Sequence, residues 1–238
     1  MTANVDVRRA DSRFHTSIGW LESYHSFSFG QHYDPDNVGH GLLLVSNDDV
    51  VAPGQGFGRH PHRDMEIVTW VLDGELEHQD STGTHGVIFP GLVQRMSAGT
   101  GVTHSEMNHS TERPVHFVQM WVPPDTAGID PDYEQLDVNR RLAEGGLVPV
   151  ASGQGHPGTV RLHQRDAVMY VARMEAGASV DLPAAAYAHL FVAKGIVCLA
   201  DDVLNAGDAV RFTDLSAALV TADVDSEIIV WAFDSAMT

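Results

Sequence analysis

The sequence predicts an all-β protein built from two related β-barrels, and three observations lead to this fold class. Short apolar segments alternate with turn sequences such as Asp73-Gly74 and Pro90-Gly91, a pattern typical of sandwiches and barrels. A weak internal repeat places strand, glycine turn, strand, glycine turn and strand in the same order in both halves of the chain. Hydrophobic residues make up 43% of the 238 residues and charged residues 19%, which is a globular composition.

The expected strands form two series, one in each half of the chain. The first series comprises residues 42–45, 65–72, 75–79, 87–89, 93–96 and 116–122. The second comprises residues 159–163, 169–174, 190–192, 197–199, 209–212 and 228–233. Each segment is a short run rich in apolar and β-branched residues and is bounded by turn residues, as strands are.

One helix and one linker complete the expected elements. Residues 133–144 have a helical rhythm, with Leu136 and Leu142 on an apolar side. Residues 123–131 are rich in Pro, Asp and Gly, which indicates a linker between the two repeat units. We therefore expect a first domain over residues 1–135 and a second over residues 136–238.

The charge balance excludes several classes of partner. The chain has 14 Lys and Arg against 32 Asp and Glu, a formal net charge of −18, so direct binding to nucleic acid or to an anionic membrane is not expected. No apolar run is long enough to span a bilayer, and the first residues have no apolar signal segment. Cys198 is the single cysteine, so no intramolecular disulfide can form. We expect a cytoplasmic monomer.

Histidine is the unusual feature of the composition, because the 14 histidines equal Lys and Arg together. His60 with His62, and His104 with Glu106, form two pairs spaced two residues apart. Side chains at i and i+2 of an extended chain point to the same face, so each pair supplies one side of a site if the two strands lie opposite each other. Three neutral imidazoles and one carboxylate would hold a divalent metal and leave positions open for a reaction.

Other candidates for the site have weaker support. Glu66 shares the even parity of His60 and His62, and we expect it to orient a ligating imidazole rather than to bind the metal. The histidines without a paired spacing are expected to be ordinary surface or hydrogen-bonded residues; they are His78, His85, His109 and His116. Coincidental surface pairs remain the simple alternative for the main cluster.

Longer motifs around these residues resemble a known family. Residues 58–66, Gly-Arg-His-Pro-His-Arg-Asp-Met-Glu, together with residues 74–81 resemble the first signature of the cupin superfamily, and more narrowly that of the pirin family. Residues 94–106 resemble the second pirin signature. The resemblance is strong over about residues 20–135 and looser beyond, and it points in particular to the bacterial pirin-like quercetinases.

This resemblance implies a bicupin, in which two antiparallel jelly-roll β-barrels face each other and only the first holds metal. It implies that His60, His62, His104 and Glu106 bind one divalent transition metal, Fe(II) in the first place and Mn, Co, Ni, Cu or Zn otherwise. It also implies a dioxygenase that cleaves a flavonol such as quercetin with O2 and releases carbon monoxide, with Glu106 as the catalytic base. The second unit offers only His189 near the matching strand, so we expect no metal there.

Two other functions are compatible with the sequence. Some pirins resemble redox sensors that regulate a protein partner without turnover, and an acidic surface would suit a basic partner. A cupin sugar isomerase would need cations for a phosphate, and Arg59, Arg63 and Arg95 are the nearest candidates. Ordinary surface positions at strand ends explain these arginines more simply.

Overall fold

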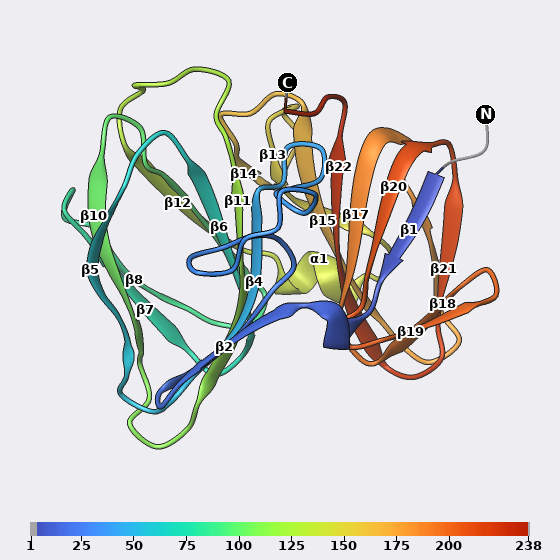
Figure 1. The fold of residues 1–238 in the computed structure, drawn as a ribbon, viewed down its shortest axis with the longest axis horizontal. Coiled ribbons are helices and arrows are strands. Elements are labelled where there is room, and N and C mark those ends of the chain that lie inside the picture. The colour runs from blue at the N-terminus through green and yellow to red at the C-terminus, as the bar shows by residue number, and fades with distance from the viewer. Residues whose placement is uncertain (1–3, 238) are drawn as a thin grey trace.

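The computed structural model describes residues 4–237, which form two units of β-sheet that lie side by side (Figure 1). Each unit contains one seven-stranded and one four-stranded sheet. The predicted all-β class and the two-unit architecture of the cupin type are confirmed. The sheets of each unit do not join into a closed barrel, because the hydrogen-bonded strand order ends at both edges of every sheet.

The first unit carries both pairs of predicted metal ligands. Its seven-stranded sheet has the strand order β12-β9-β6-β11-β4-β3-β2, and these strands are β2 (Phe14–Ile18), β3 (Leu21–His25), β4 (Val45–Val51), β6 (Glu66–Asp73), β9 (Leu92–Ser97), β11 (Val115–Val122) and β12 (Asp132–Asp137). Its four-stranded sheet has the order β5-β10-β7-β8, and these strands are β5 (Gly56–His62), β7 (Leu76–Asp80), β8 (His85–Ile88) and β10 (Val102–Asn108).

The second unit repeats this arrangement. Its seven-stranded sheet has the order β1-β20-β17-β22-β15-β13-β14, formed by β1 (Asn4–Arg8), β13 (Val148–Ser152), β14 (Val160–Arg161), β15 (Ala167–Met174), β17 (Ala185–Lys194), β20 (Ala209–Leu215) and β22 (Ser226–Phe233). Its four-stranded sheet has the order β16-β21-β18-β19, formed by β16 (Ser179–Leu182), β18 (Ile196–Leu199), β19 (Asp202–Asn205) and β21 (Ala218–Ala222).

The two seven-stranded sheets pack against each other and form the largest apolar core. Val68 and Trp70 of β6 share this core with Phe191 of β17 and Trp231 of β22, and all four are buried. The Trp70 Nε1 group also donates a hydrogen bond of 2.6 Å to Glu227 across the interface. Since one face of the first large sheet is covered by the second unit, its opposite face is left to line the interior of the first unit.

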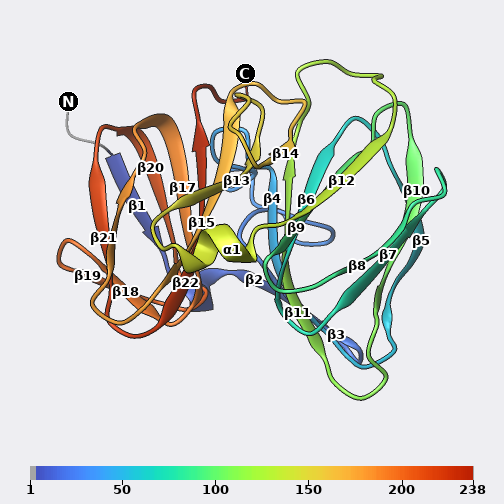
Figure 2. The same ribbon diagram turned by 180° about the vertical axis from the view of Figure 1, so that it is seen from behind.

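Two expectations about local structure need correction. The predicted helix over residues 133–144 is wrong in its first half, where β12 pairs with β9 through alternating contacts such as Leu136 with Val93. Only α1 (Asn139–Ala143) is helical, and Figure 2 shows it between the two units. The strand expected at residues 42–45 begins instead at Val45. A short 3-10 turn, η1 (Ala10–Ser12), precedes β2.

The first strand of the chain belongs to the second unit. Strand β1, from the start of the chain, pairs with β20 of the second unit, and β12 spans the expected domain boundary at residues 135 and 136 while it belongs to the first sheet. The division into domains of residues 1–135 and 136–238 therefore stays a prediction. Among residues 4–237, no helix has the length and apolar character needed to cross a membrane.

Candidate metal centre

The two ligand pairs predicted from the sequence lie on neighbouring antiparallel strands. In the register of β5 and β10, His104 is opposite His60 and Val102 is opposite His62. The register shifts between His104 and Glu106, at a β-bulge or irregularity in β10, and such bulges re-aim side chains next to functional sites. The expectation that the two strands oppose each other is confirmed.

Three imidazoles meet at this point. His60, His62 and His104 each offer a ring nitrogen, and these nitrogens all lie within 4.8 Å of one another. The Nε2 atoms of His60 and His104 are 3.0 Å apart, while His60 Nδ1 lies 2.7 Å from the Gly58 carbonyl oxygen, which fixes that ring. The buried Nε2 of His62 has no hydrogen-bond partner among the described residues. Ring nitrogens that converge while one buried nitrogen stays unpaired fit a metal ion.

Glu106 is buried beside the imidazoles and is held by one side chain of the facing sheet. The Nε2 atom of Gln119 donates to both carboxylate oxygens of Glu106, each at 2.8 Å. The Oε1 atom of Gln119 accepts a hydrogen bond of 3.1 Å from Trp121 Nε1, which fixes the orientation of the amide. With His78 and His104, Glu106 forms a second possible ligand group with donor atoms within 4.8 Å of one another. The two groups share His104.

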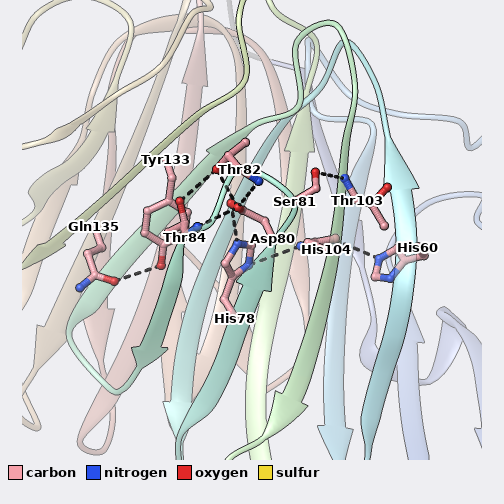
Figure 3. A network of polar contacts seen from close by, with 10 residues as sticks. All are labelled: His60, His78, Asp80, Ser81, Thr82, Thr84, Thr103, His104, Tyr133 and Gln135. Atoms are coloured by element: carbon pink, nitrogen blue, oxygen red, sulfur yellow. Dashed lines mark hydrogen bonds and ion pairs between the residues drawn. The ribbon is translucent and has the colours of Figure 1, made fainter.

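A chain of polar contacts supports His104 from behind (Figure 3). His104 Nδ1 lies 3.4 Å from His78 Nδ1, and His78 Nε2 lies 3.3 Å from Asp80 Oδ2. Asp80 in turn accepts hydrogen bonds from Thr82 and Thr84. If His104 ligates through Nε2, its Nδ1–H can donate to His78 and His78 Nε2–H to Asp80, an arrangement that orients ligating histidines and sets their tautomer.

The spacing of the histidines in the sequence does not reveal His78 or Gln119 as residues of this centre. His78 is fully buried, unlike the ordinary histidines with which it was grouped. The available signal was alternation: Leu76, His78 and Asp80 face inward from β7 at every second position. The other three fit the simple expectation, because each lies at an exposed or half-buried position beside a carboxylate; they are His85, His109 and His116.

Burial lowers the basicity of two of the imidazoles. Desolvation, followed by the neighbouring His104 and His60 rings, lowers the pKa of His62 to about 4. Desolvation, followed by His60 and His78, lowers the pKa of His104 to about 3. Both rings are therefore neutral near pH 7, which is the form that binds a metal.

Glu66 does not lie at this centre, and the expectation that it orients a ligand is wrong. It is fully buried on the face of β6 that packs against the second unit, and its Oε2 accepts a hydrogen bond of 3.0 Å from the backbone N–H of His163. Between His62 and Glu66 the backbone turns at Asp64, which has a φ of 48°, and passes from one sheet to the other. The alternation of side-chain direction therefore does not continue from His62 to Glu66, and Glu66 does not point toward the imidazoles.

A cavity of about 540 Å³ opens onto His60, His62 and Glu106. Aromatic side chains line part of it, among them Phe29, Phe57 and Trp121. The Trp121 ring meets the His62 ring edge-on at a centroid distance of 4.9 Å. The volume lies in the usual range of small-molecule sites.

Two of the arginines considered for a phosphate site lie beside carboxylates. Arg95 is fully buried, and its guanidinium contacts Asp132, Glu134 and the carbonyl oxygen of Arg161, so its charge is already compensated. Arg63 is exposed beside Asp64. In the second unit, His189 is buried on β17 with its ring 5.6 Å from that of Phe27. Both ligand groups found among residues 4–237 come from the first unit.

Comparison with known proteins agrees with this arrangement. The Pirin family model matches residues 6–122, and a model described as Quercetinase C-terminal cupin domain matches residues 149–233. A protein of Escherichia coli strain K12 named quercetin 2,3-dioxygenase is 40% identical over 228 residues, which cover 95% of this chain and 97% of the relative. A Mycobacterium tuberculosis protein whose name includes quercetin 2,3-dioxygenase is 57% identical over 97% of this chain and 96% of the relative.

A solved structure adds a metal to the comparison. The crystal structure of the bacterial pirin YhhW from Escherichia coli in complex with nickel(II) matches with a TM-score of 0.90 and 37% sequence identity. The match covers 98% of this chain and 100% of that chain. A divalent metal is thus compatible with this fold, and the imidazole cluster described above supplies suitable ligands.

Proposed function

The chain belongs to the pirin family, and from that premise we propose that it is a metal-dependent dioxygenase of the quercetinase type. The reaction is the cleavage of a flavonol such as quercetin with O2, with release of carbon monoxide. The observation that carries the proposal is the meeting of His60, His62 and His104, next to a cavity that His60, His62 and the buried Glu106 line. The name of the Escherichia coli relative supplies the substrate class.

The ligands we propose are His60, His62, His104 and Glu106. When bound, a divalent transition metal supplies Lewis acidity that makes an enolic hydroxyl more acidic, and it gives access to dioxygen chemistry. We propose Fe(II) as the native metal. A set of three imidazoles and one carboxylate suits Fe(II), and it also suits the nickel(II) named in the YhhW structure.

Glu106 is the proposed base that takes the proton from the 3-hydroxyl group of the flavonol. Its carboxylate lines the cavity and is held by the Gln119 amide on both oxygens. A base that is already oriented needs little rearrangement before it accepts the proton.

The cavity wall fits a flat aromatic substrate. Phe29 meets Trp121 edge-on with centroids 5.6 Å apart, and Phe57 meets Trp20 in the same manner at 5.2 Å. Rigid aromatic surfaces of this kind pack against ring systems and keep water from the reacting face.

The test is turnover of quercetin by protein loaded separately with Fe(II), Mn(II), Co(II), Ni(II) or Cu(II). We expect loss of the flavonol absorbance together with one carbon monoxide per molecule consumed, and no turnover by the His62→Ala variant. The matched control is His85→Ala, an exposed histidine of the neighbouring strand β8 that contacts Glu77, which should retain activity. Full metal occupancy without turnover for every metal would reject this function.

A further inference from the structure

A row of polar side chains crosses the inner face of the seven-stranded sheet beyond the metal centre. Asn47 and Asp49 of β4 lie in this row, and in the strand register Asn47 is opposite Gln119 on one side and His25 on the other. Ser23 is opposite Asp49 on β3. All of these side chains line the cavity that contains Glu106. Nothing in the proposed proton transfer uses Asn47 or Asp49.

Hydrogen bonds from β2 and β3 hold Asn47 and Asp49 in place. His25 Nδ1 lies 2.9 Å from Asn47 Oδ1, and His25 Nε2 lies 2.9 Å from the Thr16 hydroxyl. Because Asn47 Oδ1 can only accept, His25 carries its proton on Nδ1 and accepts from Thr16 at Nε2. The Ser23 hydroxyl donates to Asp49 Oδ1. The neighbours therefore set the orientation of the Asn47 amide and occupy one oxygen of Asp49.

One polar atom of each residue is left without a partner. No described residue hydrogen-bonds to Asn47 Nδ2 or to Asp49 Oδ2, although Asn47 is 5% exposed and Asp49 only 3% exposed. Neither atom is among the buried side-chain atoms that lack a partner, and both residues line the cavity, so these two polar atoms are available to hydrogen-bond a ligand bound there. Burial also raises the pKa of Asp49 to about 7, and its carboxyl group can then serve as hydrogen-bond donor or acceptor.

The row lies within reach of a substrate held at Glu106. Gln119 contacts Glu106 directly, and Asn47 is on the next strand, about 5 Å away across the sheet. A three-ring flavonol placed with its 3-hydroxyl at Glu106 extends over several such strand spacings. A second hydroxyl group of the same molecule can therefore meet Asn47 and Asp49.

We propose that Asn47 and Asp49 are specificity-determining residues that bind a phenolic hydroxyl of the substrate, separate from its metal-binding oxygens. This inference rests on the proposed function for the flavonol class, and it adds that hydroxylated members are selected. A site built around such a hydrogen bond discriminates strongly against an analogue that lacks the hydroxyl, because its buried groups then stay unpaired.

The test compares quercetin with 3-hydroxyflavone, which has the same 3-hydroxyl and carbonyl but no other hydroxyl group. Dissociation constants and kcat/KM are measured with metal-loaded wild type, Asp49→Ala, Asp49→Asn and Asn47→Ala. The control is Asp201→Asn, an exposed aspartate of the second unit. We expect Asp49→Ala to weaken quercetin binding roughly 10-fold or more and to change 3-hydroxyflavone binding less than about threefold. Asp49→Asn should recover part of the preference.

Each outcome decides the proposal. Equal losses for both ligands in Asp49→Ala and Asn47→Ala, or no loss in either variant, would overturn it, provided that melting temperature and metal content match the wild type. A wild type that binds quercetin in preference to 3-hydroxyflavone without turning it over rejects the dioxygenase function, while the variants still decide the role of Asn47 and Asp49. A wild type that binds neither ligand overturns both proposals.

Discussion

Gln119 Nε2 lies 2.8 Å from both carboxylate oxygens of Glu106, and these two residues come from opposite sheets of the first unit. The contact joins the four-stranded sheet, which carries the proposed ligands, to the large sheet that backs onto the second unit. Since Gln119 Oε1 is occupied by Trp121, the amide cannot rotate without losing hydrogen bonds at both ends. The position of the proposed base thus depends on the packing of the whole unit.

The first prediction concerns this contact. Gln119→Ala should leave Glu106 present but free to turn, so we expect metal affinity to fall about 10- to 100-fold, as is typical when a residue behind a ligand is removed. Competition titration with a chromogenic chelator measures the affinity. Gln154→Ala removes an exposed amide of the second unit and serves as control. Unchanged affinity in Gln119→Ala would show that Glu106 does not need this support.

The second prediction tests the support behind His104. His78→Phe keeps a buried ring but removes the nitrogen that lies 3.4 Å from His104 Nδ1. We expect metal affinity to fall roughly 10-fold, because the His104 ring loses the partner that sets its tautomer. The same change at exposed His85 should have no effect on affinity. A His78→Phe protein that folds and binds metal like the wild type would limit His78 to packing.

The sequence predicts the apolar strands of the fold better than the strands that carry polar residues. The apolar runs at residues 65–72 and 228–233 predict strands correctly, because both faces of these strands are buried. Strand β4 reads Val-Ser-Asn-Asp-Asp-Val-Val, and only its apolar start was expected to be strand, because Asn47 and Asp49 face a cavity instead of an apolar core. Spacing indicates the imidazoles, because they form pairs two residues apart, but it does not indicate Gln119, whose contact with Glu106 forms only when the two sheets face each other.

The third prediction follows from the raised pKa of Asp49. Its carboxyl group titrates near pH 4 in the unfolded chain and near 7 in the folded protein, where burial raises the pKa, with Asp48 and Glu106 adding to the effect. The folded state therefore holds a proton that the unfolded state has lost, and stability falls as pH rises through this window. We therefore compare the free energy of unfolding of Asp49→Asn with that of the wild type. We expect this difference to shift in favour of the variant by about 2–3 kcal/mol as the pH rises from 5 to 7.

Urea unfolding of both proteins at pH 5, 6, 7 and 8 measures this difference. The histidine titrations occur in both proteins and cancel in the comparison, so the remaining slope belongs to Asp49. A constant difference across this range would mean that Asp49 is already ionised in the folded protein at pH 5.

The fourth prediction separates Glu66 from the metal centre. Because Glu66 Oε2 accepts from the His163 backbone at the interface between the units, Glu66→Ala should leave a buried N–H without its partner and destabilise the fold by about 1–3 kcal/mol. Metal stoichiometry, measured by elemental analysis after gel filtration, should remain one per chain. Glu106→Ala, by contrast, should lose the bound metal. If folded Glu66→Ala lost its metal, Glu66 would have to act on the centre despite lying on the opposite face of the sheet.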